Sequence, residues 1–407
     1  IIYFPHLKLR MIIKIIFWVA LFMIVYNYVL YGLLLSVLIF FRNKLKKRNL
    51  IESQVDLPPL TLVVAIFNEE QILEKKIKNT LSLNYPEDKL HILFVTDGSS
   101  DSSNEIIQKY PQIQLVFKNE RRGKVAAINH AMESVKTPLV VFCDANTILN
   151  QDCLIQLADH YKDPKVGAVA GEKKVIDPSE QQDIAGAGEG LYWRYESLLK
   201  KLDSEFYTVV GAAGELFSMR TNLYRPVEEF VLLDDFIISL RICKMGYRVL
   251  YEPKATAIES SSASLGEEKK RKVRIGAGGF QSMWMLRRLL NIFKYGKLSF
   301  QFISHRVLRW AICPFMLPVI FITNLLITIF HGNLFYHTLF ILQVIFYFAA
   351  LAGYILSVKN SKIRIFYIPF YFVFMNVCIY LGVIKFLSGK QSVLWDKAVR
   401  KPDIITT

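Results

Sequence analysis

Cysteine is scarce in this sequence, with five residues in 407, and no two of them form a CxxC pair or a spacing typical of a metal site. Two of the five, Cys313 and Cys378, lie in apolar stretches, so we expect all five to be packing residues in a reducing compartment. No cleavable signal peptide is expected, because the first apolar run, Ile12 to Phe41, is too long and has no small-residue cleavage site after it. Internal repeats and low-complexity segments are also missing.

Acidic residues are few, since 35 Asp and Glu stand against 50 Lys and Arg and leave a formal charge of +15. This excess suits contact with anionic lipid head groups and anionic substrates. A nucleic-acid partner is not expected, because the basic residues gather beside apolar segments, where the positive-inside rule accounts for them.

The hydrophobic content of 53% is too high for an ordinary soluble protein of this length and predicts a membrane protein. Four stretches are long enough to cross a bilayer: Ile12 to Phe41, Trp310 to Phe330, Phe335 to Val358 and Ile365 to Leu387. The middle of the chain has none.

Charge next to these stretches bears on orientation. Arg42, Lys44, Lys46, Lys47 and Arg48 follow the first span and place the central domain in the cytosol. Three further spans put the C-terminus outside, whereas basic residues argue for inside, so the topology of the last span stays open. Those residues are Lys390, Lys397, Arg400 and Lys401.

Short β-branched runs alternate with amphipathic stretches in the central part, which predicts an α/β fold with a mostly parallel sheet. The expected strands are Leu60 to Ile66, Leu90 to Thr96, Ile113 to Phe117 and Leu139 to Cys143. The expected helices are Glu69 to Leu83, Ser102 to Tyr110 and Lys124 to Glu133. Ligands of such sheets bind beyond the carboxyl ends of the strands.

Residues 274–309 mix apolar and basic side chains, which predicts a helix in the interfacial plane with Trp284 and Phe280 in lipid and Arg287 and Arg288 toward phosphates. A core helix with a solvated basic edge is the alternative. The expected divisions are 1–48 (first span and basic flank), 49–265 (central α/β domain), 266–309 (interfacial helices) and 310–407 (C-terminal spans and tail).

Polar groups follow several expected strands. Asp97 and Asp101 come after one strand, in TDGSSD, where a carboxylate can accept hydrogen bonds from a nucleobase or ribose, although a plain turn uses the same residues. Asp144 and Asn146 follow another, and oxygen ligands at this spacing suit Mg²⁺ or Mn²⁺ beside a diphosphate. A helix N-cap is the competing account of Asp144.

Two more groups stand out. Asp234 and Asp235 lie in an apolar setting where adjacent acids repel, so one can hold its proton and act as a general base; a structural pair satisfied by Arg241 is the alternative. Arg306 and Arg309, just before Trp310, share one helix face and can grip phosphate, although interfacial anchoring also explains them.

Taken in order, these motifs resemble those of the processive family 2 membrane glycosyltransferases, a group that includes cellulose, hyaluronan, chitin-oligosaccharide and poly-N-acetylglucosamine synthases. The resemblance runs from VVAIFNEE (Val63 to Glu70) to LWDKAVR (Leu394 to Arg400). It implies a GT-A-like nucleotide-sugar-binding domain, one N-terminal and about three C-terminal transmembrane helices, and interfacial helices between them.

The resemblance also implies roles for individual residues. Asp235 corresponds to the catalytic base and Asp144 with Asn146 to the D-x-D metal motif. Donor-binding positions are Ala65, Asn68, Glu69, Asp97, Lys124, Asn129, Arg306, Arg309 and Trp310. Acceptor positions are Gly214, Glu215, Asp234 and Trp310. This chain departs from the family pattern with Arg306 in place of Gln, which puts acceptor contacts in doubt, and with Asn146 in place of the second Asp, which puts metal affinity in doubt.

The function thus implied is inverting sugar transfer from a nucleotide-sugar, with UDP-sugar expected, to a growing extracellular or capsular polysaccharide at the cytoplasmic face of a bacterial inner membrane. A single-addition enzyme with a lipid-linked acceptor is the first alternative. A transporter with a nucleotide-binding domain is another, but its spans should carry charges that line a path, and these show few. A structural anchor is the third. A bundle of four spans is small for threading a polymer, which favours a dimer or a secretion partner.

Overall fold

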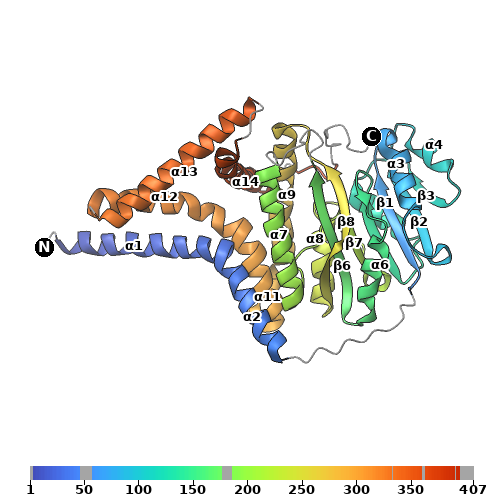
Figure 1. Ribbon diagram of the computed structural model, residues 1–407, viewed down its shortest axis with the longest axis horizontal. Helices are drawn as coiled ribbons and strands as arrows, with labels where there is room; N and C mark the ends of the chain where they lie inside the picture. Colours follow the sequence, from blue (N-terminus) through green and yellow to red (C-terminus); the bar gives the residue numbers. More distant parts are fainter. Residues whose placement is uncertain are drawn as a thin grey trace.

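The computed structural model describes residues 3–45, 57–176, 186–331, 333–359, 363–389 and 391–394. Lys46, Lys47, Arg48 and the basic residues at 390, 397, 400 and 401 lie outside the described residues, as does most of LWDKAVR. One large sheet with its helices forms one end of the molecule, and long helices project from the other (Figure 1).

An eight-stranded mixed sheet in the order β3-β2-β1-β4-β7-β6-β8-β5 forms the centre of the domain. Its first half is parallel, as the sequence predicts: β1 lies between β2 and β4, and β2 pairs with β3. The strands of this half are β1 (Leu60–Ile66), β2 (Leu90–Asp97), β3 (Ile113–Lys118) and β4 (Leu139–Asp144). Each agrees with its expected range to within a residue, because short runs rich in β-branched residues between amphipathic stretches are distinctive.

The second half of the sheet departs from the parallel pattern. β7 runs antiparallel to both β4 and β6, and β5 runs antiparallel to β8, whereas β6 and β8 are parallel. These strands are β5 (Ile148–Leu149), β6 (Val166–Ile176), β7 (Leu216–Arg220) and β8 (Arg248–Ser260). The parallel half therefore ends at β4, where Asp144 lies.

Helices cover both faces of the sheet and enclose two apolar cores. The domain helices are α3 (Glu70–Leu81), α4 (Ser103–Gln108), α5 (Lys124–Met132), α6 (Cys153–Asp159) and α8 (Asp234–Lys244). Short 3-10 turns are η2 (Glu87–Lys89), η3 (His160–Lys162), η4 (Thr221–Leu223) and η5 (Arg287–Leu290). All five cysteines are buried and unpaired.

Two long helices, α7 (Gly186–Phe206) and α9 (Leu265–Met285), stand between the sheet and the projecting helices (Figure 1). The short helices α10 (Ile292–Tyr295) and α11 (Lys297–Gln301) follow α9. Around them Trp284 is 64% exposed and Phe293 is 99% exposed, which fits a surface that faces lipid. Phe280 differs from the expectation, because its ring packs on Phe386 of the last helix.

Within the described residues, four helical segments are long and apolar enough to span a membrane: Lys8–Lys44, Lys297–Phe330, Leu334–Val358 and Arg364–Leu387. The first contains α1 (Tyr3–Val25), the π-helix η1 (Tyr26–Leu30) and α2 (Tyr31–Leu45). At the π-turn the helix bends, and α2 leaves the line of α1 (Figure 1). Tyr31 and Leu35 of α2 then pack on Leu199 of α7, so half of the expected span covers the domain.

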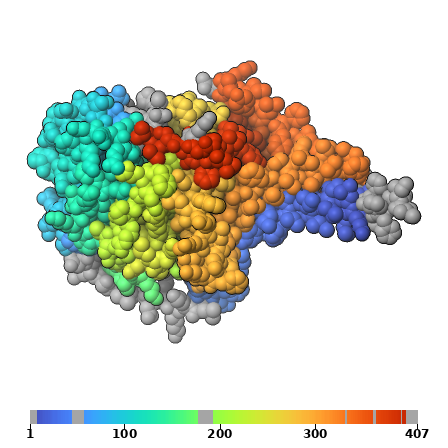
Figure 2. All heavy atoms as spheres, turned by 180° about the vertical axis from the view of Figure 1, so that it is seen from behind, coloured from blue at the N-terminus to red at the C-terminus, as the bar shows by residue number. Residues whose placement is uncertain are grey.

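The other three segments hold η6 (Phe302–Ile312), α12 (Cys313–His331), α13 (Leu334–Val358) and α14 (Arg364–Leu387). Figure 1 shows α14 nearly end-on, whereas α1, α12 and α13 run across the view. α14 packs along α9, and the backbone of Gly276 lies close to Gly382. The carbonyl oxygen of Val393 lies 3.2 Å from where a Cβ on Gly123 would be, so the chain after α14 returns to the domain. In Figure 2 the red atoms, most of which belong to α14, lie over one side of the domain.

Candidate active site

A cavity opens where β1 and β4 end, between α5 and the start of α8. Its polar lining residues are Lys124, Asp234 and Asp235, and Ala65 and Gly214 form part of its wall. Segments that are far apart in the sequence thus meet at the carboxyl edge of the parallel strands, where the fold predicts a ligand.

The DGSSD turn after β2 is held in place by the end of β1. Asn68 has a positive φ of 53°, and its Oδ1 accepts a hydrogen bond from Ser100 N at 2.8 Å. The Asp101 carboxylate accepts from Glu70 N at 3.0 Å and so supplies a partner for the first turn of α3. Non-glycine residues that are held at positive φ by such contacts are frequent at functional sites.

Asp97 is 4% exposed, and its two oxygens accept hydrogen bonds from Arg122 N and Gly123 N, each at 2.8 Å. It therefore shapes the turn that leads into α5, where Gly123 has a φ of 102°. A second hollow beside it is lined by Thr96, Asp97 and His130, among others. A carboxylate has spare lone pairs for a base or ribose, so the predicted donor contact of Asp97 stays a prediction.

Lys124, the first residue of α5, points at the end of β4. Its Nζ donates to Asp144 Oδ1 at 2.5 Å. Burial opposes the charged ammonium, but Asp144 and Asp234 together raise the pKa of Lys124 above its usual range. Burial raises the pKa of the Asp144 carboxyl, and Lys124 lowers it in part. A cation thus sits among carboxylates at the predicted metal motif.

Asp234 and Asp235 form the first turn of α8. Asp235 Oδ2 and Lys124 Nζ lie 3.5 and 3.4 Å from the place of a Cβ on Gly214, so all three border one small space. Burial and the neighbouring Asp234 charge raise the pKa of Asp235 to about 7. Arg241, the partner that the structural account offers for this acidic pair, binds Glu228 at 2.6 Å. A carboxyl with this pKa is suited to general-base catalysis.

Glu215, next to Gly214 of the cavity wall, begins a series of ion pairs that leads into the protein. It forms an ion pair with Lys173, which also binds Glu259. Arg271 of α9 reaches Glu259 at 3.2 Å and so joins this helix to the chain. Burial opposes ionisation of Glu215, yet Lys173 brings its pKa below the usual range.

Residues 61–220 match the family model described as glycosyl transferase family 2. The chain therefore contains a glycosyl transferase family 2 domain. A poly-beta-1,6-N-acetyl-D-glucosamine synthase of Staphylococcus aureus (strain COL) is 29% identical over 237 residues, which are 56% of this chain and 56% of that protein. The synthase of the same name from Staphylococcus epidermidis is 26% identical over 248 residues, 59% of this chain and 58% of that protein. The chain thus spans little more than half of the length of these relatives.

A solved structure shares the GT-A-like fold of this transferase almost throughout. It is a mannosyltransferase from Pyrobaculum calidifontis in complex with GDP-Man and Mn²⁺, with a TM-score of 0.63 and 21% identity, and the match covers 92% of this chain and 100% of that one. The match includes more than the family 2 domain and so extends into the long helices.

The metal motif of this transferase offers few protein ligands. Among the described residues no three His, Cys, Asp or Glu side chains gather as a metal site. Asp144 supplies a carboxylate and Asn146 an amide oxygen, and Mg²⁺ and Mn²⁺ prefer oxygen ligands. Mg²⁺ is usually held by one or two carboxylates together with substrate phosphates, so this donor set fits a metal that arrives with the diphosphate.

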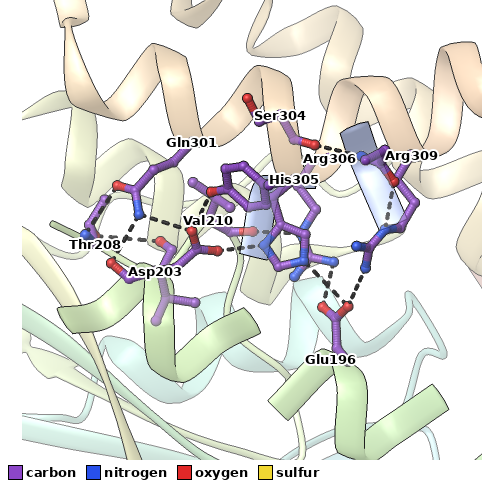
Figure 3. Close-up of polar contacts among 12 residues, drawn as sticks. Glu196, Asp203, Thr208, Val210, Gln301, Ser304, His305, Arg306 and Arg309 are labelled. Atoms are coloured by element: carbon purple, nitrogen blue, oxygen red, sulfur yellow. Dashed lines mark hydrogen bonds and ion pairs between the residues drawn. The ribbon is translucent and has the colours of Figure 1, made fainter. Parts of the chain in front are cut away.

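Three predicted donor residues of the transferase have other partners in the structure. Both hydrogen-bonding groups of Asn129 bind the backbone of Val227, at 2.8 and 3.0 Å. Arg306 and Arg309 bind Glu196, at 2.7 and 2.8 Å, within the protein interior (Figure 3). The interfacial-anchor account of the two arginines does not describe them either, since they are 6% and 3% exposed.

Trp310 stays close to the site. Its ring packs on Phe236, the residue after Asp235, with centroids 5.5 Å apart. Gly279 of α9 makes room for it, because a Cβ there would come within 2.6 Å of the indole. Trp310 therefore packs beside the start of α8, and its predicted acceptor contact stays a prediction.

Two buried charged residues near the site, Lys173 and Glu196, have no signal in the sequence. Lys173 lies in an alternating strand and Glu196 on a polar helix, where charged side chains normally face solvent. Their burial depends on partners more than 40 residues away, and periodicity carries no such signal.

Proposed function

We propose that this chain is an inverting glycosyltransferase that adds sugars from a nucleotide-sugar, UDP-sugar in the first place, to a growing polysaccharide at the cytoplasmic membrane face. The observation that carries the proposal is the meeting of Lys124, Asp144 and Asp235 at the carboxyl edge of the sheet. The relation to poly-N-acetylglucosamine synthases supports a polysaccharide product and N-acetylglucosamine as the sugar.

In the proposed reaction Asp235 accepts the proton from an acceptor hydroxyl. That oxygen attacks the anomeric carbon from the face opposite the diphosphate, and the bond between that carbon and the diphosphate oxygen breaks. One displacement inverts the configuration, so an α-linked donor gives a β-linkage. General-base action of this kind contributes about 10²- to 10⁴-fold to the rate.

The leaving diphosphate needs positive charge, and Lys124 is placed to supply it. The surrounding carboxylates keep the Lys124 ammonium ionised. The ammonium can exchange its hydrogen bond to Asp144 for one to a phosphate oxygen of the diphosphate. A divalent metal, Mg²⁺ or Mn²⁺, held by Asp144 and Asn146, supplies further neutralisation of the diphosphate when bound. Asp97 fixes the turn before Lys124 and borders the second hollow, which we propose binds the nucleobase of the donor.

The purified protein, incubated with a panel of UDP- and GDP-sugars and a short sugar acceptor, tests the proposal. We expect nucleotide release with UDP-N-acetylglucosamine and products that carry many added sugars. A single added sugar points to the single-addition alternative, and no release with any donor overturns the proposal.

A further inference from the structure

A cluster of buried charges outside the cavity joins α7 to η6 (Figure 3). We call it the buried ionic cluster; it consists of Glu196, Asp203, His305, Arg306 and Arg309. Each of these side chains is at most 6% exposed. Charges are rarely buried unless each has partners, so these contacts determine how the two helices fit together.

Glu196 is the centre of the cluster. One carboxylate oxygen binds Arg306 Nη1 at 2.7 Å, and the other binds Arg309 Nη1 at 2.8 Å and lies 3.3 Å from His305 Nε2. Burial opposes its charge, yet the charge of Arg306 and its other neighbours lowers the pKa of Glu196 well below the usual range. A neutral residue at this position leaves two guanidinium groups buried without their counter-charge.

Arg309 has its donors occupied by protein. Besides Glu196, it reaches Asn27 Oδ1 at 3.4 Å and Tyr195 Oη at 3.2 Å. Asn27 lies in the π-turn η1, and its Nδ2 donates to the carbonyl of Ser304 in the π-helix η6 at 2.6 Å. The irregular turns of two long helices therefore meet at this arginine.

Asp203, two turns further along α7, fixes the start of η6. Its carboxylate binds His305 Nδ1 at 2.5 Å and accepts from Gln301 Nε2 at 3.0 Å and Tyr31 Oη at 2.5 Å. The two acids of α7 thus hold η6 at both ends of one helical face. This leaves Arg306 little freedom to move.

Arg306 connects the cluster to the reacting groups. Its Nε donates to the carbonyl of Val210 at 2.7 Å, at the start of the loop that leads to Gly214 and Glu215. Its guanidinium lies 5.5 Å from the Trp310 ring and 6.0 Å from Phe236, the residue after Asp235. A Gln at this position has no positive charge, so it has no need of the buried Glu196.

We propose that Glu196 is a positioning residue for sugar transfer to the acceptor. By binding Arg306 it holds the loop from Val210 to Glu215 and the Trp310 ring beside Asp235. The inference rests on the proposed function and names the acceptor side of that site. Glu196 touches no reacting atom. Its effect is expected on acceptor use and not on donor binding.

The test compares Glu196→Gln, Arg306→Gln and the double variant in purified, membrane-reconstituted protein. The donor is UDP-N-acetylglucosamine and the acceptor a short N-acetylglucosamine oligosaccharide. For each single variant we expect kcat/KM for the acceptor to fall about 10²-fold, as for a displaced substrate-positioning group, with unchanged donor KM. Asp159→Asn, which removes an exposed ion pair with Lys162, is the control and is expected to behave as wild type.

The double variant leaves only Arg309 without its counter-charge, whereas Glu196→Gln alone leaves two guanidinium groups so, and we therefore expect it to recover about tenfold relative to the product of the single effects. Arg306→Lys keeps the charge with fewer donors, folds more readily and should give an intermediate loss. Losses that simply multiply, or donor and acceptor parameters that fall together, overturn the inference and leave Glu196 a structural residue.

Amide hydrogen exchange separates this inference from the proposed function. In Glu196→Gln we expect faster exchange in residues 210–215 than in wild type, with or without sugar transfer. If no donor supports transfer but exchange rises there, the proposed function fails and the positioning contact stands. Unchanged exchange in this loop refutes the positioning contact itself.

Discussion

Replacing Asp235 by Asn removes the one carboxyl that both faces the cavity and has a pKa of about 7. Its ordinary value is 3.8, and a difference of about three units corresponds to about 4 kcal/mol. Because the folded pKa lies above the unfolded one, the ionised carboxylate opposes folding. The loss of stability begins near pH 4 and is complete above pH 7.

Asp235→Asn is therefore expected to be inactive and yet more stable than wild type at pH 8. The gain is at most about 4 kcal/mol, since an amide cannot be ionised and the repulsion by Asp234 disappears. Near pH 4 the two proteins should be equally stable. Donor affinity should change little, because Asp235 acts on the acceptor.

Thermal unfolding in detergent at pH 4 and pH 8, together with calorimetric titration of UDP-sugar, measures these effects. The Asp159→Asn variant again serves as the control, since its exposed pair contributes little. A thermal unfolding midpoint of Asp235→Asn below that of wild type at pH 8, or a loss of donor binding, would falsify the assignment of Asp235 as the catalytic base. Asp235 would then be a structural residue.

Three further predictions concern the same site and its surroundings. Asp234→Asn should shift the acidic limb of the pH–rate profile to lower pH, because the Asp234 charge raises the pKa of Asp235; an unchanged limb counts against this. Gly214→Ala should fold but lose most activity, since its methyl comes 3.4 Å from Lys124 Nζ and 3.5 Å from Asp235 Oδ2; full activity in a kinetic assay shows that the space is not used. A cysteine at the exposed Ser392 should be labelled in sealed vesicles from the same side as the catalytic domain, because Val393 lies against Gly123; labelling from the opposite side contradicts this topology.

The parallel half of the sheet could be predicted from the sequence because its strands are continuous apolar runs, such as Leu60 to Ile66, separated by amphipathic helices. The positions of Asp97 and Asp144 near one edge also follow from this, since parallel strands end on the same side. Asp235 begins α8 and follows no parallel strand, so its position does not follow from this pattern. What the sequence could not show is the pairing of Lys124 with Asp144, which depends on how α5 begins.

Side-chain partners that periodicity does not reveal account for several of the differences. Arg241, the partner of the acidic pair in the alternative account, binds Glu228. The bend at η1 has no sequence signal, because the apolar run continues through it and π-turns have no characteristic composition. Glu196 could not be told from a solvated residue until η6 was seen to cover it.

Transfer of radiolabelled sugar from UDP-N-acetylglucosamine by wild type and Asp235→Asn, side by side at pH 8, tests the central claim most directly. Wild type should release nucleotide and extend the acceptor, and the variant should bind the same donor with similar affinity and extend nothing. Extension at a wild-type rate by the variant would show that the carboxylates gathered at this edge of the sheet do not carry out the reaction.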